Sequence, residues 1–250
     1  MNEKLVVVKN TISSEDFVAQ MKKMRCAGNG GREKEFDLEE KLVKAGVPEV
    51  VIKVMVSEGF DECRIPLAVK KWVGGYSGKG TSSLWLSGGS GAGKSTTAAW
   101  VVKEIVEASE EPESLADDCI FVAVSDLVHG TWMGSGLYGE ENKWRLIEPL
   151  TTCPLLVLDD LGSCVRQGRE ECSVVREVVD KRWGHMLPTI YTTQYGLEEY
   201  CSSLVKAGAD IHDTTSMANR IIASLGNYVG RDDGLVKQHF VPIRWPGKRT

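Results

Sequence analysis

One glycine-rich segment constrains the fold of this chain more than any other feature of its sequence. The segment Gly88-Gly89-Ser90-Gly91-Ala92-Gly93-Lys94-Ser95 matches the pattern GxxxxGK[ST]. The apolar run Leu84-Trp85-Leu86 precedes it and predicts a strand, and residues 94–108 repeat apolar side chains at the spacing of an α-helix. A strand, such a loop and a helix in succession are typical of a phosphate-binding P-loop, although a chance glycine-rich turn is the alternative.

The residue types in this loop suit a triphosphate. Glycines allow the backbone N–H groups to point inward at phosphate oxygens, and the helix N-terminus adds its positive end. We expect Lys94 to reach the β- and γ-phosphates and the Ser95 hydroxyl to ligate Mg²⁺. The predicted nucleotide-binding residues are Gly88, Gly89, Ser90, Gly91, Ala92, Gly93, Lys94, Ser95 and Thr96. The motif therefore predicts binding of ATP, or a similar nucleoside triphosphate, together with magnesium.

A second apolar strand ends in two carboxylates. The segment Leu155-Leu156-Val157-Leu158-Asp159-Asp160 is continuously apolar before the acidic pair, as expected of a strand buried on both faces. Ligands bind at the carboxyl ends of strands in open α/β sheets. We therefore expect Asp159 to hold Mg²⁺, usually through water, and Asp160 to act as a general base on the attacking water. A strand that simply exits into a polar turn is the alternative interpretation.

Strands and helices alternate along the rest of the chain. Two further strands are predicted at Cys119–Val124 and Thr189–Thr192. Four further helices are predicted at 140–149, 170–183, 197–206 and 214–225. This alternation predicts an α/β fold with a parallel sheet covered on both sides, that is, the three-layer P-loop NTPase fold.

The part of the chain before the sheet is predicted to be mainly helical. Helices are expected at 14–27 and 36–45, and the breaker Gly28-Asn29-Gly30-Gly31 between them predicts a linker. We expect two parts, a small helical N-terminal extension (1–44) that binds a partner and an ATPase domain (45–250).

Four segments together resemble AAA+ ATPases of the DnaC/DnaI/IstB group, which are helicase loaders and transposition helper ATPases of bacteria and phages. They are the P-loop, the strand end Leu158-Asp159-Asp160-Leu161-Gly162, the run Pro188 to Tyr195, and Ala45-Gly46-Val47-Pro48, which is similar to the Ala-Gly-Ile-Pro segment that opens the ATPase module. The resemblance covers residues 45–230.

This resemblance implies roles for two more residues. The strand 189–193 would be the sensor-1 strand, lying beside the acidic strand, and Gln194 stands where the group usually has an asparagine near the γ-phosphate. Ser216 to Ile222 resembles the segment whose arginine acts as a finger on the ATP of a neighbouring subunit, which makes Arg220 the candidate. For a sensor-2 arginine, Arg231, Arg244 and Arg249 all remain open.

The resemblance also implies a function and partners. It implies an Mg²⁺-dependent ATPase that acts in DNA replication like a DnaC-type helicase loader and forms a homo-oligomer when ATP binds. The implied partner is a replicative DNA helicase or, for an IstB-like helper, a transposase. Single-stranded DNA is a further implied partner, with contacts near residues 163–169, although a solvated loop is the favoured interpretation there.

Two other interpretations remain open. A small-molecule P-loop kinase would use Arg166-Gln167-Gly168-Arg169 as a lid, but the pair Asp159-Asp160 suits water activation better than transfer to an acceptor. The second open interpretation is a nucleotide-binding switch without appreciable turnover. It stays open because Gln194 stands where the group usually has an asparagine.

Composition and charge exclude some classes of protein. No apolar run approaches twenty residues, which argues against a membrane span, and no secretory signal is recognisable. The seven cysteines include no CxxC pair, so we expect reduced thiols in a cytoplasmic protein rather than a zinc site. The formal net charge of −5 does not by itself indicate nucleic-acid binding.

Overall fold

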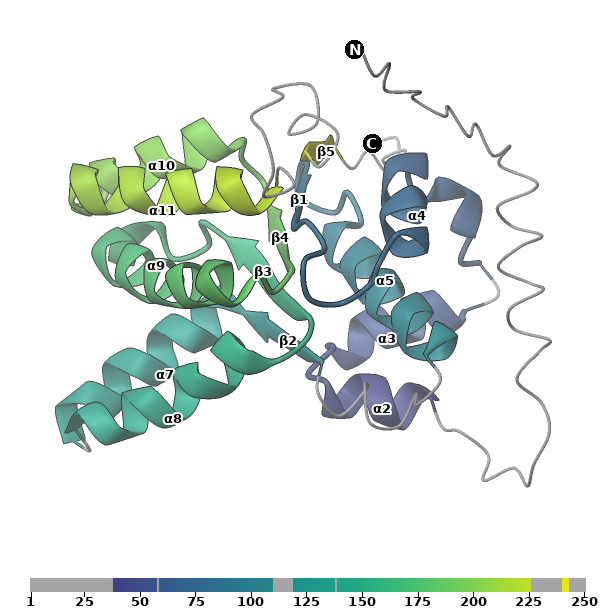
Figure 1. Cartoon of the computed structure of the whole chain (residues 1–250), viewed down its shortest axis with the longest axis horizontal. Coiled ribbons are helices and arrows are strands. Elements are labelled where there is room, and N and C mark those ends of the chain that lie inside the picture. The colour runs from purple at the N-terminus through teal and green to yellow at the C-terminus, as the bar shows by residue number, and fades with distance from the viewer. Residues whose placement is uncertain (1–37, 58, 110–118, 138, 226–239, 243–250) are drawn as a thin grey trace, which may run out of the picture. The chain divides into compact units, whose positions relative to one another are not determined.

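A five-stranded parallel sheet forms the centre of the computed structural model (Figure 1). Its strands are β1 (Leu84–Ser87), β2 (Ile120–Ala123), β3 (Leu156–Leu161), β4 (Thr189–Thr193) and β5 (Phe240–Pro242). Their order is β2-β3-β4-β1-β5, and every neighbouring pair is parallel. The parallel sheet predicted from the alternation of elements is therefore confirmed. The order places β4 between the strand of the P-loop and the acidic strand.

The structure describes residues 38–57, 59–109, 119–137, 139–225 and 240–242. The predicted helix 14–27, the linker 28–31 and the three sensor-2 candidates lie outside these residues. All described residues belong to one compact unit, Glu35–Thr250. The partner-binding role of residues 1–44 stays a prediction.

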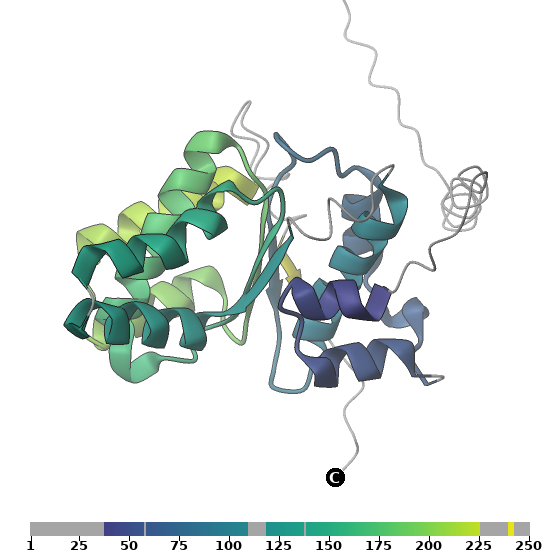
Figure 2. The same cartoon turned by 90° about the horizontal axis from the view of Figure 1, so that it is seen from below.

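Helices cover both faces of the sheet (Figure 2). The helices on one face are α2 (Leu38–Lys44), α3 (Glu49–Val56), α4 (Leu67–Gly74) and α5 (Lys94–Ala108). The helices on the other face are α7 (Val124–Leu137), α8 (Gly139–Thr152), α9 (Gly168–His185), α10 (Leu197–Lys206) and α11 (Ile211–Leu225). Two short 3-10 helices, η1 (Glu62–Arg64) and η2 (Val165–Gln167), complete the described elements.

The helix after the P-loop packs as its sequence predicts. The five apolar residues at helical spacing are all buried: Ala98, Val101, Val102, Ile105 and Val106. They hold α5 against the sheet, where it packs on β1, β3 and β4. Because α5 is fixed along its length, the turn that precedes it is held at the edge of the sheet where the strands end.

The opposite face of the sheet has an aromatic core. Trp85 of β1 is fully buried, and its ring lies 5.6 Å from Tyr191 of β4 and 6.0 Å from Tyr200 of α10, measured between ring centroids. The indole N–H donates to the carbonyl of Tyr195 at 3.3 Å. These contacts join the strand that leads into the P-loop to the segment that follows β4.

A buried arginine joins α8, α9 and β4. Arg182 is 1% exposed, and its guanidinium donates to the carbonyl oxygens of Leu150, Cys153 and Pro188 at 2.6 to 2.8 Å. Its Nε donates to the Thr189 hydroxyl at 2.8 Å. Burial lowers the pKa of Arg182. The arginine therefore acts as a structural clamp at the end of the sheet opposite the P-loop.

The structure also differs from the predicted elements. The acidic pair lies within β3 rather than at its end, because the strand resumes pairing with β4 at Leu161. Helices α3, α4 and α7 and strand β5 were not predicted. Within the described part of the chain, no helix is both long and apolar enough to cross a membrane.

Candidate nucleotide-binding site

The P-loop forms a tight turn between β1 and α5, with free space beside two of its glycines. Gly91 and Gly93 have φ angles of 72° and 83°, a left-handed conformation that suits glycine and leads directly into α5 at Lys94. A Cβ atom added at Gly89 or at Gly91 would meet no heavy atom within 4 Å. The start of α5 has no side-chain cap. The turn therefore leaves space beside unused helix N–H groups, which is what a bound phosphate needs.

Lys94 folds back over this turn. Its side chain is largely buried, and Nζ donates to the carbonyl oxygen of Gly89 at 3.0 Å. Burial lowers the pKa of Lys94, while the nearby carboxylates of Asp160 and Asp159 act in the opposite direction. The structure thus brings the predicted phosphate-binding cation close to both predicted acidic residues.

The first helical turn of α5 contacts the acidic strand through Ser95. The Ser95 hydroxyl donates to the carboxylate of Asp159, with distances of 2.8 Å to Oδ1 and 3.0 Å to Oδ2. The Thr192 hydroxyl of β4 donates to the same Oδ1 at 2.6 Å. Burial raises the pKa of Asp159, and the two hydroxyl donors lower it. A hydroxyl beside a carboxylate is a suitable oxygen-ligand set for Mg²⁺, so these residues fit the predicted metal site.

Asp160 leaves the regular line of the strand. Its φ of 59° is left-handed, and the β3–β4 register shifts between Leu158 and Leu161. The backbone N–H of Asp160 donates to the Thr192 hydroxyl at 2.8 Å. This bulge turns consecutive carboxylates in different directions, with Asp159 buried against Ser95 and Asp160 partly exposed. The general-base role of Asp160 stays a prediction.

The turn after the acidic strand is fixed by α9 and α10. The backbone N–H of Gly162 donates to Glu171 Oε1 at 2.7 Å, and the hydroxyl of Tyr200 donates to the same oxygen at 2.9 Å. Glu171 is fully buried, and burial raises the pKa of its carboxyl group. Gly162 also has a positive φ of 86°, and a Cβ there would lie 2.7 Å from Cε2 of Tyr195. These contacts hold the chain just beyond Asp160.

The end of β4 lies beside the P-loop. The N–H of Gly88 donates to the carbonyl of Thr193 at 3.2 Å, and the Thr193 hydroxyl donates to the carbonyl of Leu161 at 2.8 Å. The placement of the 189–193 strand beside the acidic strand, implied by the resemblance, is confirmed. Gln194 follows directly and its side chain is exposed. Its contact with the γ-phosphate stays a prediction.

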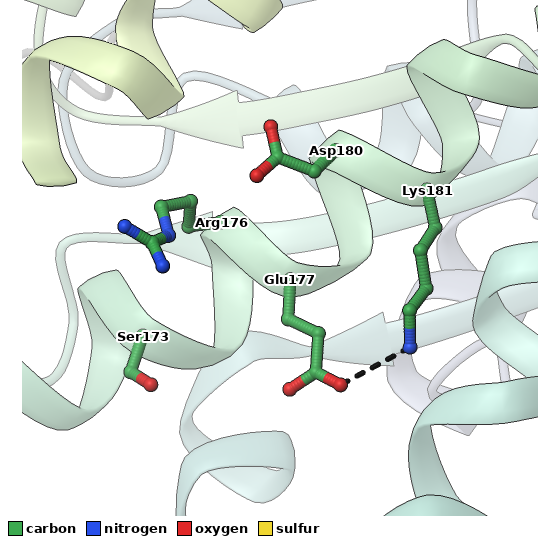
Figure 3. Close-up of a pocket in the computed structure, with 5 residues that line it drawn as sticks. All are labelled: Ser173, Arg176, Glu177, Asp180 and Lys181. Carbon is green, nitrogen blue, oxygen red and sulfur yellow. Dashed lines mark hydrogen bonds and ion pairs between the residues drawn. The ribbon is translucent and has the colours of Figure 1, made fainter.

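Arg220 lies where α11 packs on α9 rather than among the P-loop residues of its own chain. Its guanidinium carbon is 3.9 Å from the centre of the Trp183 ring, and Nε is 3.4 Å from Oδ1 of Asp180. Asp180 also lines a hollow of about 380 Å³ on α9, in which Glu177 and Lys181 pair with each other (Figure 3). A finger role on a neighbouring subunit stays a prediction.

The segment proposed as a kinase lid is held in place at one point. It comprises the end of η2 and the start of α9, and its two arginines, Arg166 and Arg169, are exposed. Gly168 between them is buried, and a Cβ there would lie 2.5 Å from the Cβ of Ala207 and 2.9 Å from the carbonyl oxygen of Leu204. This close approach to α10 restricts movement of the segment as a lid.

Sequence reasoning missed Thr192, Glu171 and Tyr200 as contributors to this region. Their sequence neighbours are themselves partly polar, so the signal in the sequence was weak, and the burial of Thr192 and Glu171 becomes visible only in the structure. No group of three or more His, Cys, Asp or Glu side chains within the described ranges is placed to hold a metal ion. The candidate Mg²⁺ site therefore rests on Ser95 and Asp159.

Comparisons with known proteins concern the fold. No protein-family model matches the chain, and no curated protein matches it either. A crystal structure of DnaI aligns with 78% of this chain and 93% of its own, at 20% identity and a TM-score of 0.52. A crystal structure of a candidate primosome component from Streptococcus pyogenes serotype M3 aligns with 87% of this chain and 100% of its own, at 16% identity and a TM-score of 0.50. A crystal structure of the DnaC helicase loader aligns with 71% of this chain and 85% of its own, at 19% identity and a TM-score of 0.44. The chain therefore has the three-layer P-loop fold of the DnaI structure, as the resemblance of its motifs predicts.

Proposed function

We propose that this protein is an Mg²⁺-dependent ATPase whose nucleotide binds at the turn between β1 and α5. The observation that carries the proposal is the contact of the Ser95 hydroxyl with the Asp159 carboxylate, with Lys94 folded over the same turn. Three residue types that magnesium and triphosphate need are thus brought together from segments more than sixty residues apart in the sequence. A glycine-rich turn that arose by chance would not be expected to bring Lys94, Ser95 and Asp159 together.

Each residue has a defined task in the proposed reaction. The backbone N–H groups of the turn bind phosphate oxygens, and Lys94 leaves the carbonyl of Gly89 to pair with the β- and γ-phosphates. Bound magnesium would neutralise phosphate charge as it develops during transfer. Ser95 and Asp159 would hold the ion, and Asp160 would accept the proton of the attacking water. Because Asp160 is partly exposed, water has access to it.

Binding and hydrolysis test this proposal separately. Affinity for a fluorescent ATP analogue, with and without Mg²⁺, measures binding, and phosphate release measures turnover. Lys94→Ala is expected to weaken binding by more than about tenfold, whereas Asp160→Asn is expected to preserve binding and slow hydrolysis about 10²- to 10⁴-fold. Lys53→Ala is the matched control, because Lys53 is an exposed lysine of α3 that pairs only locally with Glu49. Unchanged binding in the Lys94 variant would overturn the proposal.

We further propose, on the DnaI-like fold and the primosome protein of similar structure, that the partner is a replicative DNA helicase. The ATP-bound form would assemble into a homo-oligomer in the cytoplasm, and Arg220 would complete the site of the next subunit. Arg220 is 42% exposed and contacts Asp180 through a partly exposed ion pair and Trp183 through a ring contact, so it can leave Asp180 when a neighbour arrives.

The partner is tested by co-sedimentation with purified helicase in the presence of ATP, of ADP and of no nucleotide. ATP-dependent co-sedimentation, lost in Lys94→Ala, is the expected result. A transposase offered in the same assay distinguishes the IstB-like alternative, and single-stranded DNA added to the hydrolysis assay shows whether DNA changes turnover. Binding to the helicase that is identical in all nucleotide states would contradict an ATP-controlled loader.

A further inference from the structure

A buried threonine hydroxyl lies between the two acidic residues of the site. Thr192 of β4 is fully buried, and its Oγ1 donates to Oδ1 of Asp159 at 2.6 Å. The same oxygen accepts the backbone N–H of Asp160 at 2.8 Å. A hydroxyl can do both at once, since it has one proton to donate and two lone pairs to accept. The two bonds also strengthen each other, because a hydroxyl that accepts a hydrogen bond becomes a better hydrogen-bond donor.

The bulge in β3 explains why Thr192 occupies this position. Pairing between β3 and β4 passes from Leu158 opposite Tyr191 directly to Leu161 opposite Thr193. Two residues of β3, Asp159 and Asp160, therefore share the place opposite Thr192, and the regular ladder is interrupted there. The Thr192 side chain supplies an acceptor for the Asp160 N–H where the ladder does not. An uncompensated buried N–H would otherwise destabilise the bulge.

The two hydroxyl groups on Asp159 come from elements of different kinds. Ser95 lies at the start of α5, next to the turn that would receive the nucleotide. Thr192 lies in the middle of the sheet, paired with Leu86 of β1 on its other side. Its position is therefore fixed by two neighbouring strands. One oxygen of Asp159 is held by the rigid sheet, while the same carboxylate remains in contact with the nucleotide-binding turn.

We propose that Thr192 is a positioning residue of the nucleotide site, which orients the Asp159 carboxylate toward Ser95 and couples it to the backbone of Asp160. This inference rests on the proposed function, because the orientation matters only if Asp159 and Ser95 hold a metal ion. In this role Thr192 would contact neither the nucleotide nor the metal directly. It acts through Asp159 on metal binding and through the N–H of Asp160 on the direction of the second carboxylate.

Three variants separate this role from simple support of the strand. Thr192→Val removes the hydroxyl and keeps the shape, whereas Thr192→Ser keeps the hydroxyl. Thr189→Val is the matched control, because Thr189 is a buried threonine of the same strand whose hydroxyl accepts from Arg182 instead of contacting an acidic residue. Mn²⁺ affinity of the ADP-bound protein is measured by electron paramagnetic resonance, together with ADP affinity without metal and unfolding in urea.

The valine variant is expected to bind Mn²⁺ about 10- to 100-fold more weakly, as with other residues that orient a metal ligand. Metal-free ADP affinity is expected to stay unchanged, because the phosphate-binding N–H groups of the P-loop and Lys94 are not changed by this substitution. The serine variant is expected to retain wild-type Mn²⁺ affinity to within about threefold, a small step on the scale of such effects. Thr189→Val is expected to lose stability in urea but to bind Mn²⁺ like the wild type.

Other outcomes overturn the inference. Equal Mn²⁺ affinity in the valine variant and the wild type, or an equal loss in Thr189→Val, would show that Thr192 only supports the strand. If Thr192→Val does not fold, Thr192→Ala takes its place in the same comparison. A wild-type protein that binds ADP without any effect of metal would refute the proposed function itself, and this result is distinct from a failure confined to Thr192.

Discussion

Replacing Gly162 with alanine tests whether the turn after the acidic strand is as tightly fixed as its contacts indicate. Two costs are expected. The positive φ of 86° is unfavourable for alanine by about 1 to 2 kcal/mol. The new Cβ would also lie 2.7 Å from Cε2 and 2.9 Å from Cδ2 of Tyr195, far inside the usual carbon contact distance. Overpacking of this kind costs about 1 to 3 kcal/mol.

The backbone of Tyr195 is held by two hydrogen bonds, so its ring could move away only by rotation of the side chain. The Tyr195 N–H donates to the Thr193 hydroxyl at 3.2 Å, and the Tyr195 carbonyl accepts from the indole of Trp85 at 3.3 Å. We therefore expect the free energy of unfolding to fall by about 2 to 5 kcal/mol in Gly162→Ala, the sum of the backbone and packing costs. Because Gly162 follows Asp160 closely, hydrolysis is expected to slow while nucleotide affinity stays near the wild-type value.

A second glycine isolates the backbone cost. Gly208, just beyond α10, has a φ of +96°, and a Cβ there would meet no heavy atom within 4 Å. Gly208→Ala should therefore cost only about 1 to 2 kcal/mol. Urea unfolding at equilibrium measures both variants. In a Tyr195→Ala background, Gly162→Ala should cost no more than Gly208→Ala. An equal cost of the two glycine variants in the wild-type background would refute the argument from close packing.

Three other predictions concern buried and exposed charges. Burial raises the pKa of the Glu171 carboxyl group, so this group stabilises the fold fully below the usual glutamate pKa. That contribution is lost as pH rises through the folded-state pKa. Glu171→Gln should therefore gain stability relative to wild type as pH rises above the usual glutamate pKa, measured by urea unfolding, and a difference that does not change with pH would contradict this. Arg182→Met should lower the free energy of unfolding by about 2 to 5 kcal/mol, because four buried acceptors lose their donor, and a calorimetric change below about 1 kcal/mol would disprove the clamp. Arg220→Ala should change the free energy of unfolding by less than about 1 kcal/mol. The same variant should abolish the rise of specific ATPase activity with protein concentration. If that rise is unaltered, Arg220 does not act as a finger on a neighbouring subunit.

The sequence predicted those helices and strands whose pattern of apolar and polar residues agrees with their burial in the structure. Helix α5 follows a P-loop and repeats apolar residues on one face, and the structure confirms both its extent and its buried side. Helix α3 was missed because Val50 to Val56 is rich in β-branched residues, which favour strands. It forms a helix because it packs against α5, a tertiary contact that local propensity does not contain.

The candidate site was predictable only in part for the same reason. The P-loop is a local motif, so its residues could be named from the chain alone. The contact between Ser95 and Asp159 follows once β1 and β3 share a parallel sheet. The role of Thr192 depends on a bulge that sets two residues of β3 against one of β4, and such a register shift leaves no mark in either strand's own sequence.

The strand order has a consequence for how the chain is made. Both neighbours of β1 come later in the chain, β4 about a hundred residues after it and β5 almost at the end. During synthesis at about 5 to 20 residues per second, the apolar β1 strand therefore waits about 5 to 20 seconds for its first partner. Throughout that interval both of its edges are open to pairing with other chains. A nascent chain interrupted before residue 189 would expose this strand as an aggregation site, even though its P-loop motif is already complete.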